Sequence, residues 1–431
     1  MKPQEIESTI LARPLPALFP QDEGWVMPHY DGLSIANLPA TVATLLGSDL
    51  PGALPPLPRE LRAAWAPDLR RVVLVILDAL GYRLLTERWA AGEGEPLSRL
   101  AQAGRLVPLT SVFPSTTDAA LISLRTGRPP AEHGWLAYEL YLREMGIAAN
   151  AIKLVPVWSR QNDQLLKWGL DAENLVPLPT LAQHLASGGV ATKAVLSTFF
   201  IKSGFSRMLY QGFDEIRGHA HASDFWVQIR HLLAETRGER ALITAYWSGL
   251  DTLAHVYGPG TEPWQAEFRS VSHLLGRELL DLLPAEDRAG TLLLITADHG
   301  QLTIPAEGIV TANEDPQLRR HLLVPIVGES RAAFVYPRPG RAEAIRRYLE
   351  DRFPGWFAVL DSVEALEAGI MGRPIADETY ARAGQLMVLP RGSHALQRAD
   401  PPVPLVGRHG GLTPEEMLVP LIGARLEALD G

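Results

Sequence analysis

The sequence predicts an α/β fold, with a largely parallel sheet covered by helices on both faces. Two observations lead to this prediction. Short continuous runs of Val, Leu and Ile alternate with stretches of helical composition, and such runs are typical of strands buried on both faces. The 431 residues also suit one large α/β domain that carries an insertion.

The first 70 residues are rich in proline and are predicted to form an extension packed on the core. Within it we expect an extended leading segment, one helix over residues 34–46 and a loop over residues 51–60. The first strand is expected at residues 71–78 and the second at 106–112, because both are short apolar runs.

A turn rich in hydroxyl side chains, Ser115-Thr116-Thr117, follows the second strand and precedes a helix over residues 119–125. Hydroxyl residues before a helix and glycine after it, here Gly127, are normal caps. Further strands are expected at three places, with helices between them. They cover residues 193–197, 241–246 and 291–296.

The later part of the chain predicts a small α+β insertion over residues 319–398, with the order β-α-β-α-β. It divides the core into residues 71–318 and 399–431. The insertion falls between Asp298 and His409, so we expect it to lie over the candidate site as a cap.

Composition limits the possible chemistry. The chain is 46% hydrophobic and 21% charged, which is ordinary for a soluble globular protein. Its formal net charge of -9 and the lack of a long Lys/Arg run argue against a nucleic-acid polymer as partner. The absence of cysteine excludes disulfides, thiolate catalysis and sulfur-based zinc sites. Any metal must therefore be held by Asp, Glu, His and hydroxyl groups.

The sequence predicts a cytoplasmic protein without a membrane partner. No segment approaches the roughly 18 apolar residues of a membrane span. The first residues, MKPQEIESTILARPLPALFPQDEG, lack the charged region and apolar run of a signal peptide. Nothing in the sequence indicates the oligomeric state.

Candidate site residues follow several of the predicted strands: Asp78, the hydroxyl turn, Asp251 and Asp298. In open parallel sheets, ligands bind beyond the carboxyl ends of the strands. One edge of the sheet would therefore present all of these side chains together. Asp78 alone also fits a carboxylate that caps the following helix.

Three histidines complete the candidate set. Asp251 and His255 are four residues apart, so on a helix they share a face and can bind one ion; the alternative is a surface pair at helix spacing. His299, next to Asp298, fits either a ligand on a tight turn or an exposed turn residue. His409 lies among glycines, which allow close approach to a site but are also common in surface loops.

The hydroxyl turn is the candidate source of a nucleophile. Unsatisfied N–H groups and the positive end of the helix dipole at a helix N-terminus suit a phosphoryl group. A neighbouring metal would lower the hydroxyl pKa and generate the alkoxide. The alternative is a simple N-cap, which Ser and Thr favour in any helix.

Six motifs, VILDALG, FPSTT, TGRPPAEHG, YWSGLDTLAH, TADHG and HGGLTPEEMLVPLI, occur in the order found in one known group of proteins. From Val72 to about Ile422, the chain resembles the alkaline phosphatase superfamily, and most closely its type I phosphodiesterase/nucleotide pyrophosphatase branch. The resemblance implies an alkaline-phosphatase-like core that binds two divalent ions, with zinc expected first and manganese as the alternative. It implies Asp251, His255 and His409 as ligands of one ion, and Asp78, Asp298 and His299 as ligands of the other.

The family places its nucleophile nine residues before the threonine of a Thr-Gly pair, which implies Thr117 here, with Thr116 second and Ser115 third. Tyr138 stands near the position of a phosphate-contacting Asn and is a candidate substrate-binding residue, which leaves diesterase specificity open. We interpret His133 as structural. Ala79 replaces a glycine common among relatives, and the lack of cysteine argues against a sulfatase.

The resemblance implies a two-metal phosphohydrolase. Thr117 would attack phosphorus in line and form a covalent phospho- or nucleotidyl-threonine, which water would hydrolyse, with two ions about 4 Å apart stabilising the charge. The expected substrate is a small phosphodiester or a nucleotide pyrophosphate. Alternatives on the same core are a phosphomonoesterase, a phosphonate (C–P) hydrolase and a phosphomutase. A catalytically silent nucleotide-binding module is the alternative of another class.

Overall fold

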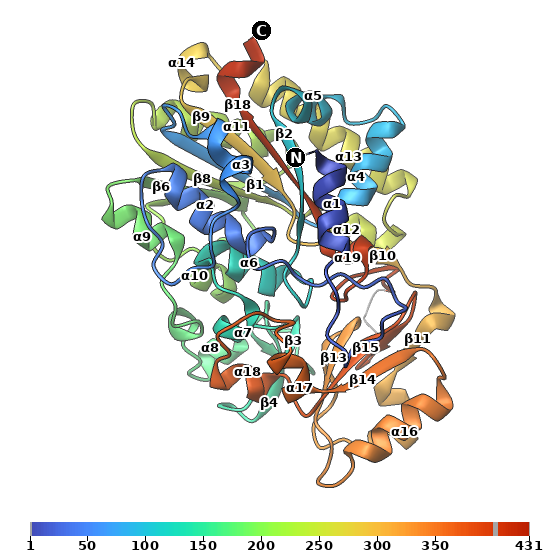
Figure 1. Cartoon of the computed structure of the whole chain (residues 1–431). Coiled ribbons are helices and arrows are strands. Elements are labelled where there is room, and N and C mark those ends of the chain that lie inside the picture. The colour runs from blue at the N-terminus through green and yellow to red at the C-terminus, as the bar shows by residue number, and fades with distance from the viewer. Residues whose placement is uncertain (1, 400–403, 431) are drawn as a thin grey trace.

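The computed structural model describes residues 2–399 and 404–430 (Figure 1). Within these residues the core is a seven-stranded sheet of order β2-β18-β9-β1-β8-β6-β7. β18 runs antiparallel to both of its neighbours, whereas the pairings from β9 to β7 are parallel. The strands are β1 (Arg71–Leu77), β2 (Arg105–Thr110), β6 (Ala191–Ser197), β7 (Glu215–His219), β8 (Ala241–Trp247), β9 (Thr291–Thr296) and β18 (Leu418–Arg425).

The apolar runs identified in the sequence form the centre of this sheet. β1 and β9 are buried at every residue, as expected for parallel strands covered on both faces. All five predicted strands are confirmed, within one or two residues at each end. β7 and β18 were not predicted. β7 is only partly buried, and Pro420 interrupts the apolar pattern of β18, where it lies opposite Pro108 of β2.

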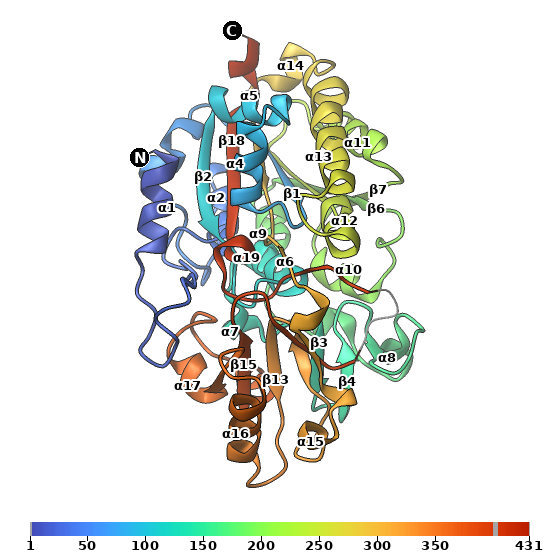
Figure 2. The ribbon, with the colours of Figure 1, turned by 90° about the vertical axis from the view of Figure 1, so that its right-hand side faces the viewer.

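Helices cover both faces of the core sheet, which confirms the predicted fold class. In one layer α11 packs on α13, and α13 packs on α5; in the other, α2 packs on α6 and α9 (Figures 1 and 2). The first layer contains α4 (Tyr82–Ala90), α5 (Glu95–Ala103), α11 (Ala222–Glu235) and α13 (Glu262–Leu274). The second contains α2 (Leu38–Leu45), α6 (Thr117–Thr126) and α9 (Leu181–Ser187).

The N-terminal region contains more helix than expected. The segment predicted to be extended begins with helix α1 (Pro3–Leu11), which buries Ile6 and Ile10 and packs against β2 (Figure 2). The surrounding prolines concealed this i, i+4 apolar pair in the sequence. The helix expected over residues 34–46 is present as η1 (Ile35–Asn37) and α2, with Ser34 as the N-cap. A short helix, α3 (Arg59–Arg62), begins at the end of the expected loop.

A second sheet lies below the core sheet in Figure 1, on the side of α6 and α12. Its order is β14-β15-β13-β12-β3-β4-β5 and all of its pairings are antiparallel. It contains the expected β-α-β-α-β order as β13 (Ala332–Val335), α16 (Ala342–Arg352), β14 (Phe357–Asp361), α17 (Ser362–Glu367) with α18 (Asp377–Arg382), and β15 (Leu386–Pro390).

Three strands of the second sheet come from much earlier in the chain, inside the predicted core segment 71–318. They are β3 (Glu139–Leu142), β4 (Ile147–Asn150) and β5 (Val155–Pro156), and they join the later strands where Glu139 pairs with Gly328 of β12 (Val327–Glu329). The predicted insertion 319–398 therefore forms only part of this sheet. Met1 and, in the second predicted core segment, residues 400–403 and 431 lie outside the described residues.

Every helix in the described ranges is too short or too polar to cross a bilayer.

Candidate metal centre and nucleophile

The predicted metal ligands lie together at the carboxyl edge of the core sheet. Asp78 follows β1 directly, and Asp298 comes two residues after β9. Asp251 and His255 lie on α12 (Gly249–Tyr257), the helix that follows β8. Because β9, β1 and β8 are parallel neighbours, their ends place these side chains side by side.

The side chains form two overlapping groups whose ligand atoms lie within 4.8 Å of one another: Asp251 with His255 and His409, and Asp78 with Asp251 and His299. Asp251 Oδ1 is 3.3 Å from His255 Nε2 and 3.9 Å from His409 Nε2. Asp78 Oδ1 is 3.5 Å from His299 Nε2. Asp251 therefore lies between the two groups.

Asp298, predicted as a ligand with Asp78 and His299, lies beside the second group, in which Asp251 takes its place. Asp298 Oδ1 accepts hydrogen bonds from the backbone N–H groups of Ala79 (3.2 Å) and His299 (3.0 Å). Its Oδ2 lies 3.7 Å from His299 Nε2. The φ of Ala79 is +60°, so this alanine lies in the left-handed region, which glycine adopts more readily.

Three carboxylate oxygens of this cluster, Asp78 Oδ1, Asp251 Oδ1 and Asp298 Oδ2, are buried without a hydrogen-bond partner in the described structure. Burying such oxygens is costly unless a cation compensates their charge. Burial, with the charges of Asp298 and Asp251, raises the pKa of Asp78 well above its usual range, and burial raises the pKa of Asp251. A set of three carboxylates and three imidazoles fits zinc or manganese.

Each of the three histidines has its Nδ1 beside a backbone carbonyl, and a proton on Nδ1 leaves Nε2 as a ligand atom. The partners are Gly407 O for His255 (2.8 Å), Gly300 O for His299 (2.9 Å) and Ser115 O for His409 (3.1 Å). His255 Nδ1 also lies 3.0 Å from the side-chain amide of Gln301. Burial and the neighbouring imidazoles lower the pKa of His409 well below its usual value, which favours the neutral form.

The three candidate nucleophiles have different partners. Thr117 Oγ1 lies 3.1 Å from His299 Nε2, and the side chain is partly exposed at the first residue of α6. Thr116 is buried and donates its hydroxyl to Glu329 Oε1 at 2.6 Å. Ser115 is buried and donates to a backbone carbonyl at 2.7 Å. Of the three hydroxyls, that of Thr117 faces the metal-ligand cluster.

Two residues near the cluster were missed by sequence reasoning. Tyr246 of β8 donates its hydroxyl to Asp78 Oδ2, which leaves Oδ1 for the cluster. Glu329 of β12 accepts from the hydroxyl of Thr116 and from the backbone N–H of Tyr138 (2.7 Å). Burial raises the pKa of Glu329 to about 8. Both contacts join residues far apart in the chain and leave no local pattern.

Tyr138 and His133 lie outside both ligand groups. The side chain of Tyr138 is 37% exposed, and its backbone is joined through Glu329 to Thr116. His133 is buried: its Nδ1 accepts from the N–H of Trp135 (3.1 Å) and its Nε2 pairs with the hydroxyl of Ser123 (3.1 Å). These partners give His133 a structural environment outside both ligand groups.

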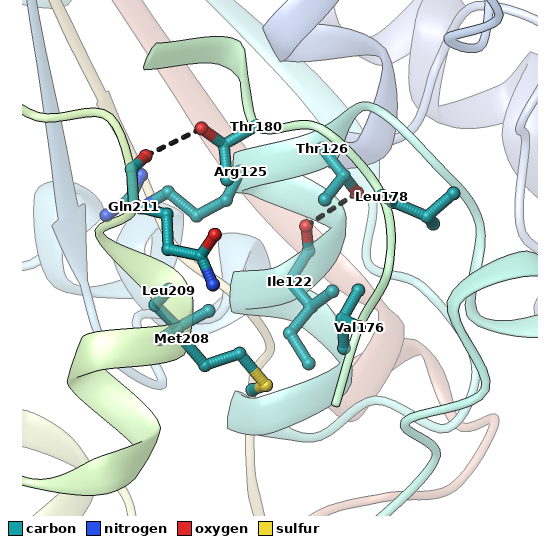
Figure 3. Close-up of a pocket in the computed structure, with 9 residues that line it drawn as sticks. All are labelled: Ile122, Arg125, Thr126, Val176, Leu178, Thr180, Met208, Leu209 and Gln211. Carbon is teal, nitrogen blue, oxygen red and sulfur yellow. Dashed lines mark hydrogen bonds between the residues drawn. The ribbon is translucent and has the colours of Figure 1, made fainter. Parts of the chain in front are cut away.

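A small cavity of about 10 Å³ lies at the other end of α6 (Figure 3). It has room for about one water molecule. Its lining comes from Ile122, Arg125, Thr126, Val176, Leu178, Thr180, Met208, Leu209 and Gln211. It is too small for a substrate, so we do not assign it to the site.

Most of the chain matches one known protein family. A family model described as type I phosphodiesterase/nucleotide pyrophosphatase matches residues 72–411. The chain belongs to this family. Its members are metal-dependent hydrolases of phosphoric esters, so the predicted enzyme class is confirmed. The comparison with curated proteins gives no match.

Solved structures confirm the predicted alkaline-phosphatase-type fold. Murine ectonucleotide pyrophosphatase/phosphodiesterase 5 is 16% identical with a TM-score of 0.61, over 82% of this chain and 87% of that one. Its inactive threonine-to-alanine variant in complex with AMP is 15% identical with a TM-score of 0.61, over 82% and 88%. Phosphonoacetate hydrolase from Sinorhizobium meliloti, in complex with phosphonoformate, is 20% identical with a TM-score of 0.59, over 84% and 95%.

Proposed function

We propose that the chain is a two-metal phosphohydrolase that cleaves phosphodiester or nucleotide pyrophosphate bonds through a covalent intermediate on Thr117. One observation carries the proposal. The hydroxyl of Thr117 lies 3.1 Å from Nε2 of a candidate metal ligand, His299, at the edge where three carboxylate oxygens without a hydrogen-bond partner in the described structure are buried.

The six predicted residues would hold the two ions. Asp251, His255 and His409 would bind one, and Asp78, Asp298 and His299 the other, with Asp251 close enough to contribute to both. We propose zinc, with manganese as the alternative, because both accept a mixed oxygen and imidazole set. When bound, the ions supply Lewis-acid stabilisation and lower the pKa of a coordinated hydroxyl.

The residues of the chain would then act in two displacements. Thr117 Oγ forms a bond to phosphorus as the bond to the leaving oxygen breaks, and the product is a phospho- or nucleotidyl-threonine. Water then attacks the same phosphorus and releases Thr117. The N-terminus of α6 would stabilise the phosphoryl oxygens through its dipole, and the backbone carbonyls beside the histidines orient their rings.

Small phosphate esters or nucleotides are the proposed substrates, without a nucleic-acid polymer or a membrane as partner. The murine relative in complex with AMP supports a nucleotide. The phosphonoacetate hydrolase, 95% of which is covered, supports a phosphonate C–P hydrolase as the second candidate. Tyr138 is proposed to contact the substrate. A cytoplasmic location is proposed as well, and cell fractionation tests it.

A substrate panel with metal-loaded protein tests the proposal. Bis-p-nitrophenyl phosphate should turn over faster than p-nitrophenyl phosphate or phosphonoacetate. Quenched reactions should yield a peptide with a phosphoryl or nucleotidyl group on Thr117. Faster monoester turnover would contradict a diesterase, and release of phosphate from phosphonoacetate alone would favour the C–P hydrolase. Loss of the adduct in Thr116→Ala, but not in Thr117→Ala, would assign the nucleophile to Thr116.

A further inference from the structure

The turn between β12 and β13 reaches from the second sheet to the candidate site. Glu329, at the end of β12, bonds to the hydroxyl of Thr116 (2.6 Å) and to the backbone N–H of Tyr138 (2.7 Å). Thr116 immediately precedes Thr117. One carboxyl group of the second sheet therefore holds the residue next to the proposed nucleophile.

Two residues further on, Arg331 makes a bidentate ion pair with Glu416. Its Nε lies 3.2 Å from Oε1 and its Nη2 lies 3.1 Å from Oε2. Both side chains are 0% exposed. A further donor of Arg331 bonds to the backbone carbonyl of His394. The second sheet is thus tied to α19 (Pro414–Met417) of the core by a fully buried charge pair.

Glu416 in turn holds the loop that carries His409. Its Oε1 accepts from the backbone N–H of Gly411 (2.8 Å), and its Oε2 accepts from the hydroxyl of Thr413 (2.9 Å). Arg331 is therefore linked to a proposed metal ligand through few contacts. It pairs with Glu416, Glu416 binds the N–H of Gly411, and His409 lies two residues before Gly411.

The glycines of this loop lie between the two carboxylates. A Cβ on Gly410 would be 2.6 Å from Glu329 Cβ, and a Cβ on Gly411 would be 2.7 Å from Glu416 Oε2. The φ of Gly410 is +115°, which L side chains rarely adopt. The close packing leaves the His409 loop little freedom to shift relative to Glu329 and Glu416.

A buried ion pair such as Arg331–Glu416 is by itself weak evidence for a stabilising role, because apolar residues of similar volume often replace such pairs without loss of stability. We propose that Arg331 and Glu329 are positioning residues of the proposed two-metal site. Arg331, through Glu416, fixes the loop of His409, and Glu329 fixes the Thr116–Thr117 turn. Together they position the Nε2 of His409 and the Oγ1 of Thr117 toward the cluster of proposed metal ligands.

Metal affinity of the purified full chain tests the role of Arg331 independently of substrate. Zinc would be titrated into chelator-treated protein in competition with a fluorescent chelator. The variant Arg331→Met/Glu416→Gln keeps one acceptor oxygen for the N–H of Gly411, replaces the oxygen that faces Thr413 with an NH2 group, and removes the tie to the second sheet. We expect one of the two ions to bind about 10–100-fold more weakly, as for other residues that orient metal ligands, while the affinity for the other ion is unchanged.

Arg382→Met is the matched control. Arg382 is also a buried arginine near the second sheet, with Glu144 as its ion-pair partner, and it contacts none of the proposed ligands in the described structure. Equal zinc affinities in the control and the double variant would overturn the role of Arg331. If the wild-type protein binds no zinc or manganese, the proposed function fails and this inference fails with it.

Glu329 is tested by steady-state kinetics of the zinc-loaded protein. Glu329→Ala should lower kcat about 10-fold or more by releasing the nucleophile turn, with zinc stoichiometry unchanged. Glu329→Gln retains an acceptor oxygen and should restore most of the loss. An unchanged kcat in Glu329→Ala, or no rescue by Gln, would overturn the positioning role of Glu329.

Discussion

The two sheets of the molecule contribute to the site in different ways. Five of the six proposed ligands lie on the segments that follow adjacent parallel strands of the core sheet. The sixth, His409, follows the short strand β17 (Gly407–Arg408). The second sheet contributes Glu329 and Arg331, which contact the site through Thr116 and Glu416. The core thus contains the proposed metal ligands and nucleophile. The second sheet is proposed to fix the positions of two core loops, the Thr116–Thr117 turn and the loop of His409. The following experiments separate these contributions.

The largest effect is expected at the core edge. Thr117→Ala should lower turnover by about 10³-fold or more, because removing a nucleophile eliminates the covalent route. Zinc content, measured by mass spectrometry of the metal, should stay near that of the wild type. Thr116→Ala is the matched control and should lose much less activity. Comparable losses in both variants would mean that the turn, rather than one hydroxyl, is required.

Metal removal should lower the local stability of the carboxyl edge of the core sheet more than that of the second sheet. Without ions, the buried oxygens of Asp78, Asp251 and Asp298 have no compensating charge. Zinc at about 100 times its Kd should raise the free energy of unfolding by about 3 kcal/mol for each of the two ions, as mass action requires. Hydrogen exchange with and without zinc should show the main change in β1, β9 and α12. Equal protection of the second sheet would contradict this localisation.

The pH dependence of stability tests the buried site of His133, which ends α7 (Pro130–His133), a helix that packs against both α6 and α18. Burial lowers the pKa of His133 to about 3, so the native state stays neutral while the unfolded state gains a proton below pH 6.5. Stability is therefore lost as pH falls from about 6.5 toward 3, by up to about 1.4 kcal/mol per pH unit for this group. Urea unfolding of His133→Gln should show a shallower acid slope. An identical slope in wild type and variant would exclude this contribution.

The smallest effect is expected at the turn after β1. Ala79 adopts a φ of +60°, which is unfavourable for a residue with a Cβ. Ala79→Gly should raise the free energy of unfolding by about 0.5–1 kcal/mol, since glycine adopts this conformation readily. Denaturant unfolding of the zinc-loaded protein measures it. A loss of stability would show that the surrounding structure requires the methyl group.

The two sheets also differ in how far the sequence predicts them. Continuous apolar runs identified β1, β8 and β9, and the residues at their ends proved to lie together. β3, β4 and β5 pair locally with one another, but they join the rest of the second sheet only through the pairing of Glu139 with Gly328. That pairing spans almost 200 residues and leaves no local pattern, so the three strands were not assigned to this sheet. For the same reason no sequence signal marked Glu329, Arg331 or Tyr246 as neighbours of the site.

A crystal structure of the zinc-loaded protein with orthovanadate tests the central claim most directly. We predict two anomalous peaks, one among Asp251, His255 and His409 and the other among Asp78, Asp298 and His299, with Thr117 Oγ1 as the side-chain oxygen nearest vanadium. A single peak, or a vanadate bound through Thr116 with Thr117 turned away, would contradict the two-metal, Thr117-based account.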